Sequence, residues 1–176
     1  MVRISKTGTK KSAQKSSMAS RGLIDEGGKA PALHLADQSG HKHRLSDYVG
    51  RWVILYFYPR DNTPGCTKQA CQFRDAWAKL NRSGTVVLGI SPDTQASHAR
   101  FAEKFSLPFD LLVDTGAQVS NRYGVWQKKS LFGRHFMGIV RTTYLIDPAG
   151  KVAHRFDKVK VPGHDQQVLQ TIDDRC

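Results

Sequence analysis

The sequence predicts an α/β domain in which helices cover both faces of a central mixed β-sheet. Two apolar runs, residues 52–58 and 85–90, have the length and continuous hydrophobicity of strands that are buried on both faces. A helical pattern at residues 64–80 lies between them, as in the crossovers that join parallel strands. Two later runs, residues 139–146 and 151–156, flank a short turn and predict an antiparallel pair, which makes the sheet mixed.

The first elements are indicated by turns and caps. Residues 33–36 and 42–45 flank a polar turn that ends in glycine, which predicts a β-hairpin ahead of the main sheet. The helix at 64–80 has apolar side chains at helical spacing. Thr63 suits its N-cap, and Pro64 suits its first turn.

The remaining elements alternate between strand and helix. We expect a helix at 95–105, a strand at 110–113, a short helix at 117–123 and a closing helix at 164–173. This order is the layout of a thioredoxin-like three-layer sandwich with an N-terminal β-hairpin extension.

Charge divides the chain into two parts. Residues 1–22 hold six of the 27 basic side chains and no acidic one, and the whole chain of 176 residues has a formal net charge of +12. The segment has too few large apolar side chains to fold alone, so we expect a disordered basic tail ahead of one domain at residues 23–176. A nucleic-acid contact and an organelle-targeting role are alternatives, although no aromatic residue interleaves the lysines for base stacking.

The composition also bears on location. No run of about 18 apolar residues occurs, so we expect no membrane span and no membrane partner. Residues 1–22 lack the apolar centre of a secretory signal. Three cysteines do not make a disulfide scaffold, and together these features predict a reducing compartment. We expect bacterial cytoplasm, with an organelle or nucleus as the alternative in a eukaryote.

Cys66 lies where an apolar strand gives way to a helix. The unpaired N–H groups and the positive dipole end of a helix N-terminus favour a thiolate, which is the nucleophilic form of cysteine. Arg141, at the start of a later strand, is the best candidate for a nearby cation, and a plain surface arginine is the alternative. This pattern predicts that Cys66 is a reactive cysteine.

Cys71 follows Cys66 by five positions, which suggests a second cysteine that resolves the product of the first. Positions five apart in an intact α-helix place their Cα atoms about 8.7 Å apart. A disulfide needs about 7 Å or less. A bridge between these residues therefore requires the first helical turns to unwind. The alternative is that Cys71 is a small buried residue on the inner side of the helix.

These residues resemble the active site of the peroxiredoxins, and more narrowly that of the peroxiredoxin Q or bacterioferritin comigratory protein subfamily. The resemblance covers about residues 27–175. Relatives have either Glu or Gln at the position of Gln69. The matching residues are Pro59, Thr63-Pro64-Gly65-Cys66-Thr67, Cys71, Gly89-Ile90-Ser91, Tyr123-Gly124-Val125-Trp126, Lys129-Ser130 and the segment 138–147, which includes Arg141.

The resemblance implies a role for each site residue. Cys66 is the peroxidatic cysteine, which attacks the peroxide O–O bond and becomes a sulfenic acid. Cys71 is the resolving cysteine and forms an intramolecular disulfide with Cys66. Thr63 and Arg141 hydrogen-bond the thiolate and the peroxide oxygens, while Pro59 shields the pocket. The backbone N–H groups of Gly65 and Cys66 add donors.

The resemblance also implies the reaction partners. The substrates are hydrogen peroxide and organic hydroperoxides, and the disulfide is reduced by thioredoxin or glutaredoxin. No metal or other cofactor takes part, and the protein is a monomer or a weak dimer. Its role is antioxidant defence and redox homeostasis.

Two other functions are open on the sequence alone. A thioredoxin-like disulfide-exchange protein is one, although it normally has two residues between its cysteines and here there are four. A nucleic-acid-associated protein acting through the basic tail is the other. We expect Cys176 to be incidental, and His41 and His43 to be surface residues rather than metal ligands. Trp126 and Phe132 either line the peroxide entrance or pack.

Overall fold

The structure, a computed structural model, describes residues 22–175. The basic segment at residues 1–21 and Cys176 lie outside the described residues, so the expectations about the tail and about this cysteine stay predictions. The same holds for the boundary between tail and domain. No helix among residues 22–175 has the length and hydrophobicity needed to cross a bilayer.

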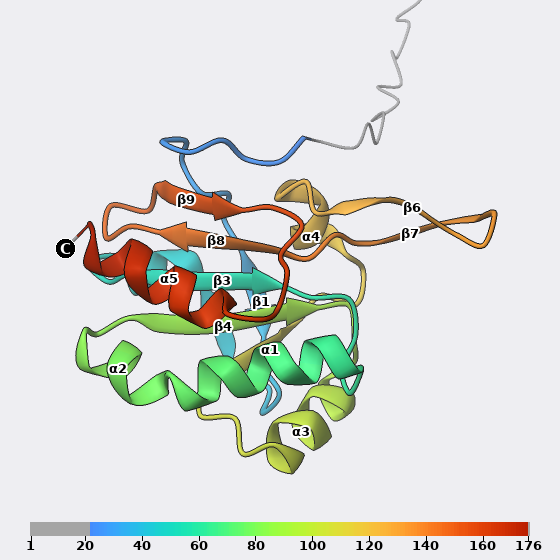
Figure 1. The fold of residues 1–176 in the computed structure, drawn as a ribbon, viewed down its shortest axis with the longest axis horizontal. Coiled ribbons are helices and arrows are strands. Elements are labelled where there is room, and N and C mark those ends of the chain that lie inside the picture. The colour runs from blue at the N-terminus through green and yellow to red at the C-terminus, as the bar shows by residue number, and fades with distance from the viewer. Residues whose placement is uncertain (1–21, 176) are drawn as a thin grey trace, which may run out of the picture.

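A five-stranded mixed sheet forms the centre of the molecule, in the order β5-β4-β3-β8-β9 (Figure 1). Strands β3 (Val53–Phe57), β4 (Val86–Ser91) and β5 (Asp110–Val113) are parallel. Strand β8 (Thr142–Ile146) pairs antiparallel with β3, and β9 (Val152–Phe156) pairs antiparallel with β8. The thioredoxin-like fold predicted from the sequence is confirmed.

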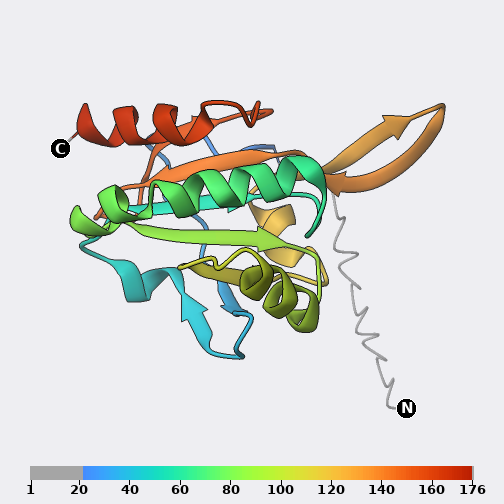
Figure 2. The ribbon, with the colours of Figure 1, turned by 60° about the horizontal axis from the view of Figure 1, so that its bottom comes forward.

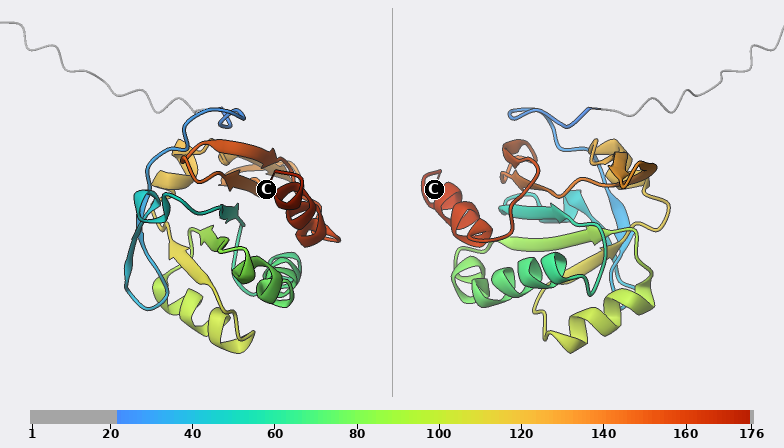
Figure 3. Two further views of the ribbon diagram at one scale, coloured as in Figure 1. Left: turned by 90° about the vertical axis from the view of Figure 1, so that its left-hand side faces the viewer. Right: turned by 45° about the vertical axis from the view of Figure 1, so that its right-hand side comes forward.

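All five residues of β3 are buried, and they alternate between two hydrophobic clusters. Ile54 and Tyr56 face the cluster to which helices α1 (Pro64–Asp75), α2 (Trp77–Arg82), α3 (Gln95–Lys104) and α5 (His164–Asp173) contribute. The other three face the cluster that contains residues of α4 (Gln118–Arg122) and the N-terminal segment. Within the first layer, α1 and α5 lie side by side (Figures 2 and 3), and the rings of Phe73 and His164 are in contact.

Tyr56 requires a glycine on the neighbouring strand. It pairs with Gly89 of β4, and a Cβ atom at Gly89 would lie 2.8 Å from Cζ and the hydroxyl oxygen of Tyr56 and from Cδ2 of Leu111. Any larger residue at this position would therefore force these two side chains to shift.

Two small antiparallel sheets flank the centre. The predicted N-terminal hairpin is present as β1 (His34–Ala36) and β2 (Lys42–Arg44), followed by the 3-10 turn η1 (Leu45–Tyr48). A second hairpin, β6 (Trp126–Leu131) and β7 (Arg134–Ile139), projects from the end of the molecule at which α1 begins (Figures 1 and 2).

The structure corrects two predicted elements. The strand expected at 139–146 is two strands, because β7 ends at Ile139 and β8 begins at Thr142. The helix expected at 64–80 is also divided, because α1 ends at Asp75 and α2 begins at Trp77, with Ala76 (ψ −6°) between them. Phe73 and Leu80 are nevertheless buried in the same cluster. The spacing of apolar residues is therefore continuous through both helices, so the sequence pattern does not reveal the break between them.

Candidate active site

Cys66 is the third residue of α1 and is only 2% exposed. The helix begins at Pro64, and its first backbone bond runs from the N–H of Thr67 to the carbonyl of Thr63 (2.9 Å). The earlier amides of a helix have no partner within it. The sulfur of Cys66 therefore lies at the positive end of a 12-residue helix, as the sequence predicts.

Arg141 lies directly beside this sulfur. Its Nη2 donates to Cys66 Sγ at 3.2 Å, and its Nη1 donates to the Gln69 side-chain oxygen at 2.6 Å. The sheet explains the contact, because Thr142 at the start of β8 pairs with Phe57 at the end of β3. An arginine just before β8 is thereby brought next to the helix that follows β3.

Gly65 leaves space for the guanidinium. A Cβ atom at this position would lie 3.3 Å from Arg141 Nη2, which is closer than ordinary van der Waals contact. A side chain at Gly65 would therefore displace Arg141. The structure thus brings three predicted site residues, Gly65, Cys66 and Arg141, into one cluster.

Gln69 is a member of the site whose contact the sequence did not predict. Its side chain is fully buried, one helical turn after Cys66, and its oxygen accepts from Arg141. Within the described residues, its Nε2 is buried without a hydrogen-bond partner. A buried amide in an otherwise apolar helix face is the signal that could have identified it.

Thr63 and Pro59 lie in the loop before α1, where both are partly exposed. Thr63 occupies the N-cap position, but its hydroxyl donates to the Arg60 carbonyl (2.9 Å) and makes no capping bond to the helix. The predicted N-cap position of Thr63 is therefore confirmed, but its side chain does not make the bond to the helix that such residues usually make. The roles of Thr63 and Pro59 toward a peroxide stay predictions.

Cys71 lies within the same continuous helix and is partly buried, and both cysteines are free thiols. This is the folded form, in which the intact helix keeps the two residues apart. Formation of a bridge between them requires a rearrangement of α1.

A buried network that the sequence did not predict fixes the loop before α1. The Nδ1 of the fully buried His98 lies 2.8 Å from Asp61 Oδ2, and its Nε2 lies 3.1 Å from the Leu112 carbonyl oxygen. The carboxylate and the carbonyl thus hold the imidazole ring from both sides. Burial raises the pKa of Asp61, but hydrogen bonds from His98, Tyr58 and Ser97 outweigh it and hold this pKa below its ordinary value. The loop is thereby bound to α3 and β5.

His164 at the start of α5 contributes a pH dependence of stability. Burial lowers its pKa to about 4, and its Nε2 is hydrogen-bonded to the Thr143 hydroxyl at 2.9 Å. The unfolded chain binds this proton below about pH 6.5, whereas the folded chain does so only near pH 4. Stability therefore falls as the pH falls through this window, by up to about 3 kcal/mol.

We expect His164→Gln to lose most of this acid sensitivity. Urea unfolding at several pH values between 7 and 4 measures the effect. His135→Gln, at an exposed position of β7, is the matched control and should behave like the wild type. An unchanged acid slope in His164→Gln would assign the sensitivity to other groups.

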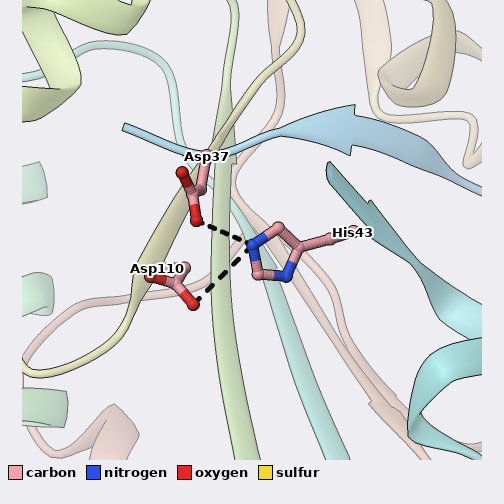
Figure 4. Close-up of side chains that lie close together, drawn as sticks. All are labelled: Asp37, His43 and Asp110. Carbon is pink, nitrogen blue, oxygen red and sulfur yellow. Dashed lines mark hydrogen bonds and ion pairs between the residues drawn. The ribbon is translucent and has the colours of Figure 1, made fainter. Parts of the chain in front are cut away.

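A second cluster lies on the N-terminal hairpin and β5 (Figure 4). His43 Nε2 is 2.8 Å from Asp37 Oδ2 and 3.8 Å from Asp110 Oδ2, and its Nδ1 is hydrogen-bonded to the Tyr48 hydroxyl. Burial raises the pKa of Asp37, but bonds from His43 and backbone amides outweigh it and lower this pKa. The predicted surface position is right for His41, whose side chain is 80% exposed, and wrong for His43, whose side chain is 11% exposed and connects the hairpin to the sheet. That neither histidine binds a metal stays a prediction.

Comparisons with known proteins agree with this geometry. Residues 27–155 match the AhpC/TSA family. The chain is 46% identical to peroxiredoxin Bcp of Bacillus subtilis, over 86% of this chain and 96% of that protein. It is 49% identical to a putative peroxiredoxin bcp of Coxiella burnetii, over 83% and 97%. The solved structure of the bacterioferritin comigratory protein of Xanthomonas campestris superposes with a TM-score of 0.81 at 32% identity, covering 86% of this chain and 99% of that one.

A thioredoxin-like fold with a cysteine at the N-terminus of its first long helix and an arginine on the sulfur defines a peroxiredoxin, a peroxidase that works through a thiol. The relatives narrow this class further. The chain belongs to the AhpC/TSA family, within its Bcp and peroxiredoxin Q subfamily. The resemblance predicted from the sequence is confirmed.

Proposed function

We propose that this peroxiredoxin reduces alkyl hydroperoxides and hydrogen peroxide with Cys66 as the peroxidatic residue. The contact of Arg141 Nη2 with the Cys66 sulfur, at 3.2 Å, carries the proposal. A fixed cation and a helix N-terminus both stabilise a thiolate and the negative charge that moves along the O–O bond. The Xanthomonas relative, studied for its alkyl peroxide reduction activity, supports the substrate class.

The first chemical step balances without a cofactor. The thiolate sulfur attacks one peroxide oxygen, the O–O bond breaks, and the other oxygen leaves as an alcohol or water after it takes up a proton. Cys66 is thereby oxidised to a sulfenic acid. In this proposal the guanidinium of Arg141, which contacts the Cys66 sulfur, and the N–H groups of Gly65 and Cys66 bind the oxygens during this transfer.

In the second step the Cys71 sulfur attacks the Cys66 sulfenate, a disulfide forms, and water leaves. Thioredoxin, with glutaredoxin as the alternative, then reduces the disulfide by thiol exchange. The first turns of α1 must open for the second step, because the intact helix separates the two Cα atoms by about 8.7 Å. The monomeric or weakly dimeric state and the cytoplasmic location stay predictions.

Mass spectrometry after one equivalent of peroxide tests this order of events. We expect the wild type to lose two hydrogen atoms and to yield one peptide pair that links Cys66 to Cys71. In Cys71→Ser we expect a gain of one oxygen atom on Cys66, because the first step proceeds and the second is blocked. We expect thioredoxin to restore the wild-type thiols. A disulfide that joins Cys66 to another cysteine would contradict the role of Cys71.

A further inference from the structure

The β6–β7 hairpin carries most of the exposed apolar surface of the described chain. Among residues 22–175, five large hydrophobic side chains are exposed, and four of them lie on this hairpin. They are Leu131 (57%), Phe132 (96%), Phe136 (45%) and Met137 (45%). Because the hairpin projects from the body (Figures 1 and 2), no other element of the domain covers them. A projecting apolar surface of this kind indicates an interaction site.

The turn at the tip gives independent support. Phe132 has φ +48° and Gly133 has φ +75°, so both central residues are left-handed, as in a type I′ turn. Asn or Gly is favoured at the first of these positions, whereas a bulky residue there is strained. Burial of the Phe132 side chain within its own domain does not offset this backbone strain, because the residue is 96% exposed. A contact outside the domain accounts for phenylalanine at this position.

The hairpin is also basic. Residues 126–139 contain Lys128, Lys129 and Arg134 and no acidic residue. The register places a cation directly across from three of the apolar side chains, in the pairs Lys128–Met137, Lys129–Phe136 and Arg134–Leu131. Paired residues share one face of a sheet, so each of these three apolar side chains has a long cationic neighbour. Lys128 and Arg134 are exposed, whereas Lys129 is partly buried and donates its Nζ to the Ile139 carbonyl at 3.0 Å. A binding partner that matches this hairpin therefore offers an apolar region for the hydrophobic side chains and anionic groups for the neighbouring cations.

Both faces of the hairpin have this character. Successive residues of a strand point to opposite faces, so the Lys128–Met137 pair lies on one face and the Lys129–Phe136 and Arg134–Leu131 pairs lie on the other. A protein partner would dock on one face. A lipid headgroup layer surrounds an inserted tip on all sides, and long cationic side chains bury their stems there while the charges stay at the phosphates.

We propose that the tip of this hairpin inserts into the headgroup layer of an anionic phospholipid bilayer. This contact revises the expectation of no membrane partner. It is peripheral and needs no spanning helix, and none is present among residues 22–175. A two-stranded hairpin leaves backbone groups on both outer edges unpaired, and these are costly in hydrocarbon. Insertion is therefore shallow and is centred on Leu131 and Phe132. This contact goes beyond the peroxidase activity and does not depend on it.

Sedimentation of the full-length chain with vesicles tests the proposal. The probe is vesicles of phosphatidylcholine containing phosphatidylglycerol, with pure phosphatidylcholine as the zwitterionic control. Phe132→Asn should weaken binding to the anionic vesicles about tenfold, since it removes the apolar ring that inserts at the tip. The variant should fold well, because it places asparagine before Gly133, the preferred sequence of this turn. Val49→Asn, at the fifth exposed hydrophobic residue, should bind like the wild type.

The basic residues in segment 1–22 also attract anionic vesicles, and every variant retains them. Binding through charge alone is screened by salt, so the difference between wild type and Phe132→Asn should persist at high ionic strength. A Phe132→Trp variant gives a second readout, because its added fluorescence should be quenched by brominated lipids in the anionic vesicles. Equal binding of wild type and Phe132→Asn, or absence of quenching, would overturn the proposal. Loss of a dimer in Phe132→Asn, with unchanged vesicle binding, would assign the hairpin to a second copy of the chain instead.

Discussion

Replacing Cys66 with serine should reduce peroxide turnover by more than about 1000-fold, the order expected when an attacking nucleophile is removed. A serine hydroxyl is scarcely ionised at neutral pH, and its oxygen cannot take up the peroxide oxygen as a cysteine sulfur does when it becomes a sulfenic acid. Turnover with hydrogen peroxide and with an alkyl hydroperoxide, coupled to thioredoxin reduction, measures the loss.

The same variant should remain folded. Cys66 is 2% exposed, and the smaller serine accepts a hydrogen bond from Arg141 where the sulfur did. We expect unfolding free energy within about 1 kcal/mol of the wild type, at the lower end of what single substitutions cost. Cys71→Ser is the matched control, since it should keep the first stoichiometric turnover. Full turnover by Cys66→Ser would remove this residue from the chemistry.

Much of the fold was predictable because its strands are buried on both faces. The predicted strand at 110–113 and helix at 164–173 coincide with β5 and α5, and the run at 52–58 contains β3. In each case side-chain burial imposes a hydrophobic pattern over several residues. The β6–β7 hairpin escaped prediction because it has no buried face along most of its length, so alternation of apolar and polar residues is absent.

The candidate site divides in a similar way. Cys66 is visible in the sequence because its environment, a helix N-terminus after a buried strand, is local. The contact of Gln69 is not visible in the sequence, because its partner Arg141 lies 72 positions away. The same holds for His98, whose partner Asp61 lies 37 positions away. A buried polar residue on an apolar helix face shows that a partner exists, but only the sheet order identifies it.

The proposed mechanism places two opposing requirements on helix α1. Folded, it presents its N-terminus to Cys66 and brings Gln69 to Arg141. Unwound, it lets Cys71 reach Cys66. In the proposed mechanism, oxidation of Cys66 adds an oxygen atom to the sulfur that Arg141 contacts, which disturbs the first state. Through the 3.2 Å contact between Arg141 Nη2 and Cys66 Sγ, the oxidation state of the sulfur thus affects the stability of the helix.

Replacing Arg141 with methionine should lower the rate of Cys66 oxidation by about 100- to 1000-fold, the range measured when one donor that stabilises developing charge is removed. The variant loses the guanidinium charge beside the Cys66 sulfur. It also loses the hydrogen-bond donor to the Gln69 side-chain oxygen. Stopped-flow oxidation by limiting peroxide measures the rate, and alkylation by iodoacetamide at neutral pH reports thiolate reactivity in parallel. Arg82→Met, at an exposed position of α2, is the matched control and should react at the wild-type rate.

A double variant separates catalysis from folding. Arg141→Met leaves the buried oxygen of Gln69 without its donor, which should cost about 1–3 kcal/mol of stability. Adding Gln69→Leu removes the orphaned polar group, so stability should recover, because replacing both partners of a buried hydrogen bond by apolar groups is nearly neutral. The oxidation rate should not recover, since the guanidinium charge of Arg141 is still missing from beside the Cys66 sulfur. Recovery of both would show that Arg141 acts only by holding the helix, and wild-type oxidation in Arg141→Met would remove it from the reaction.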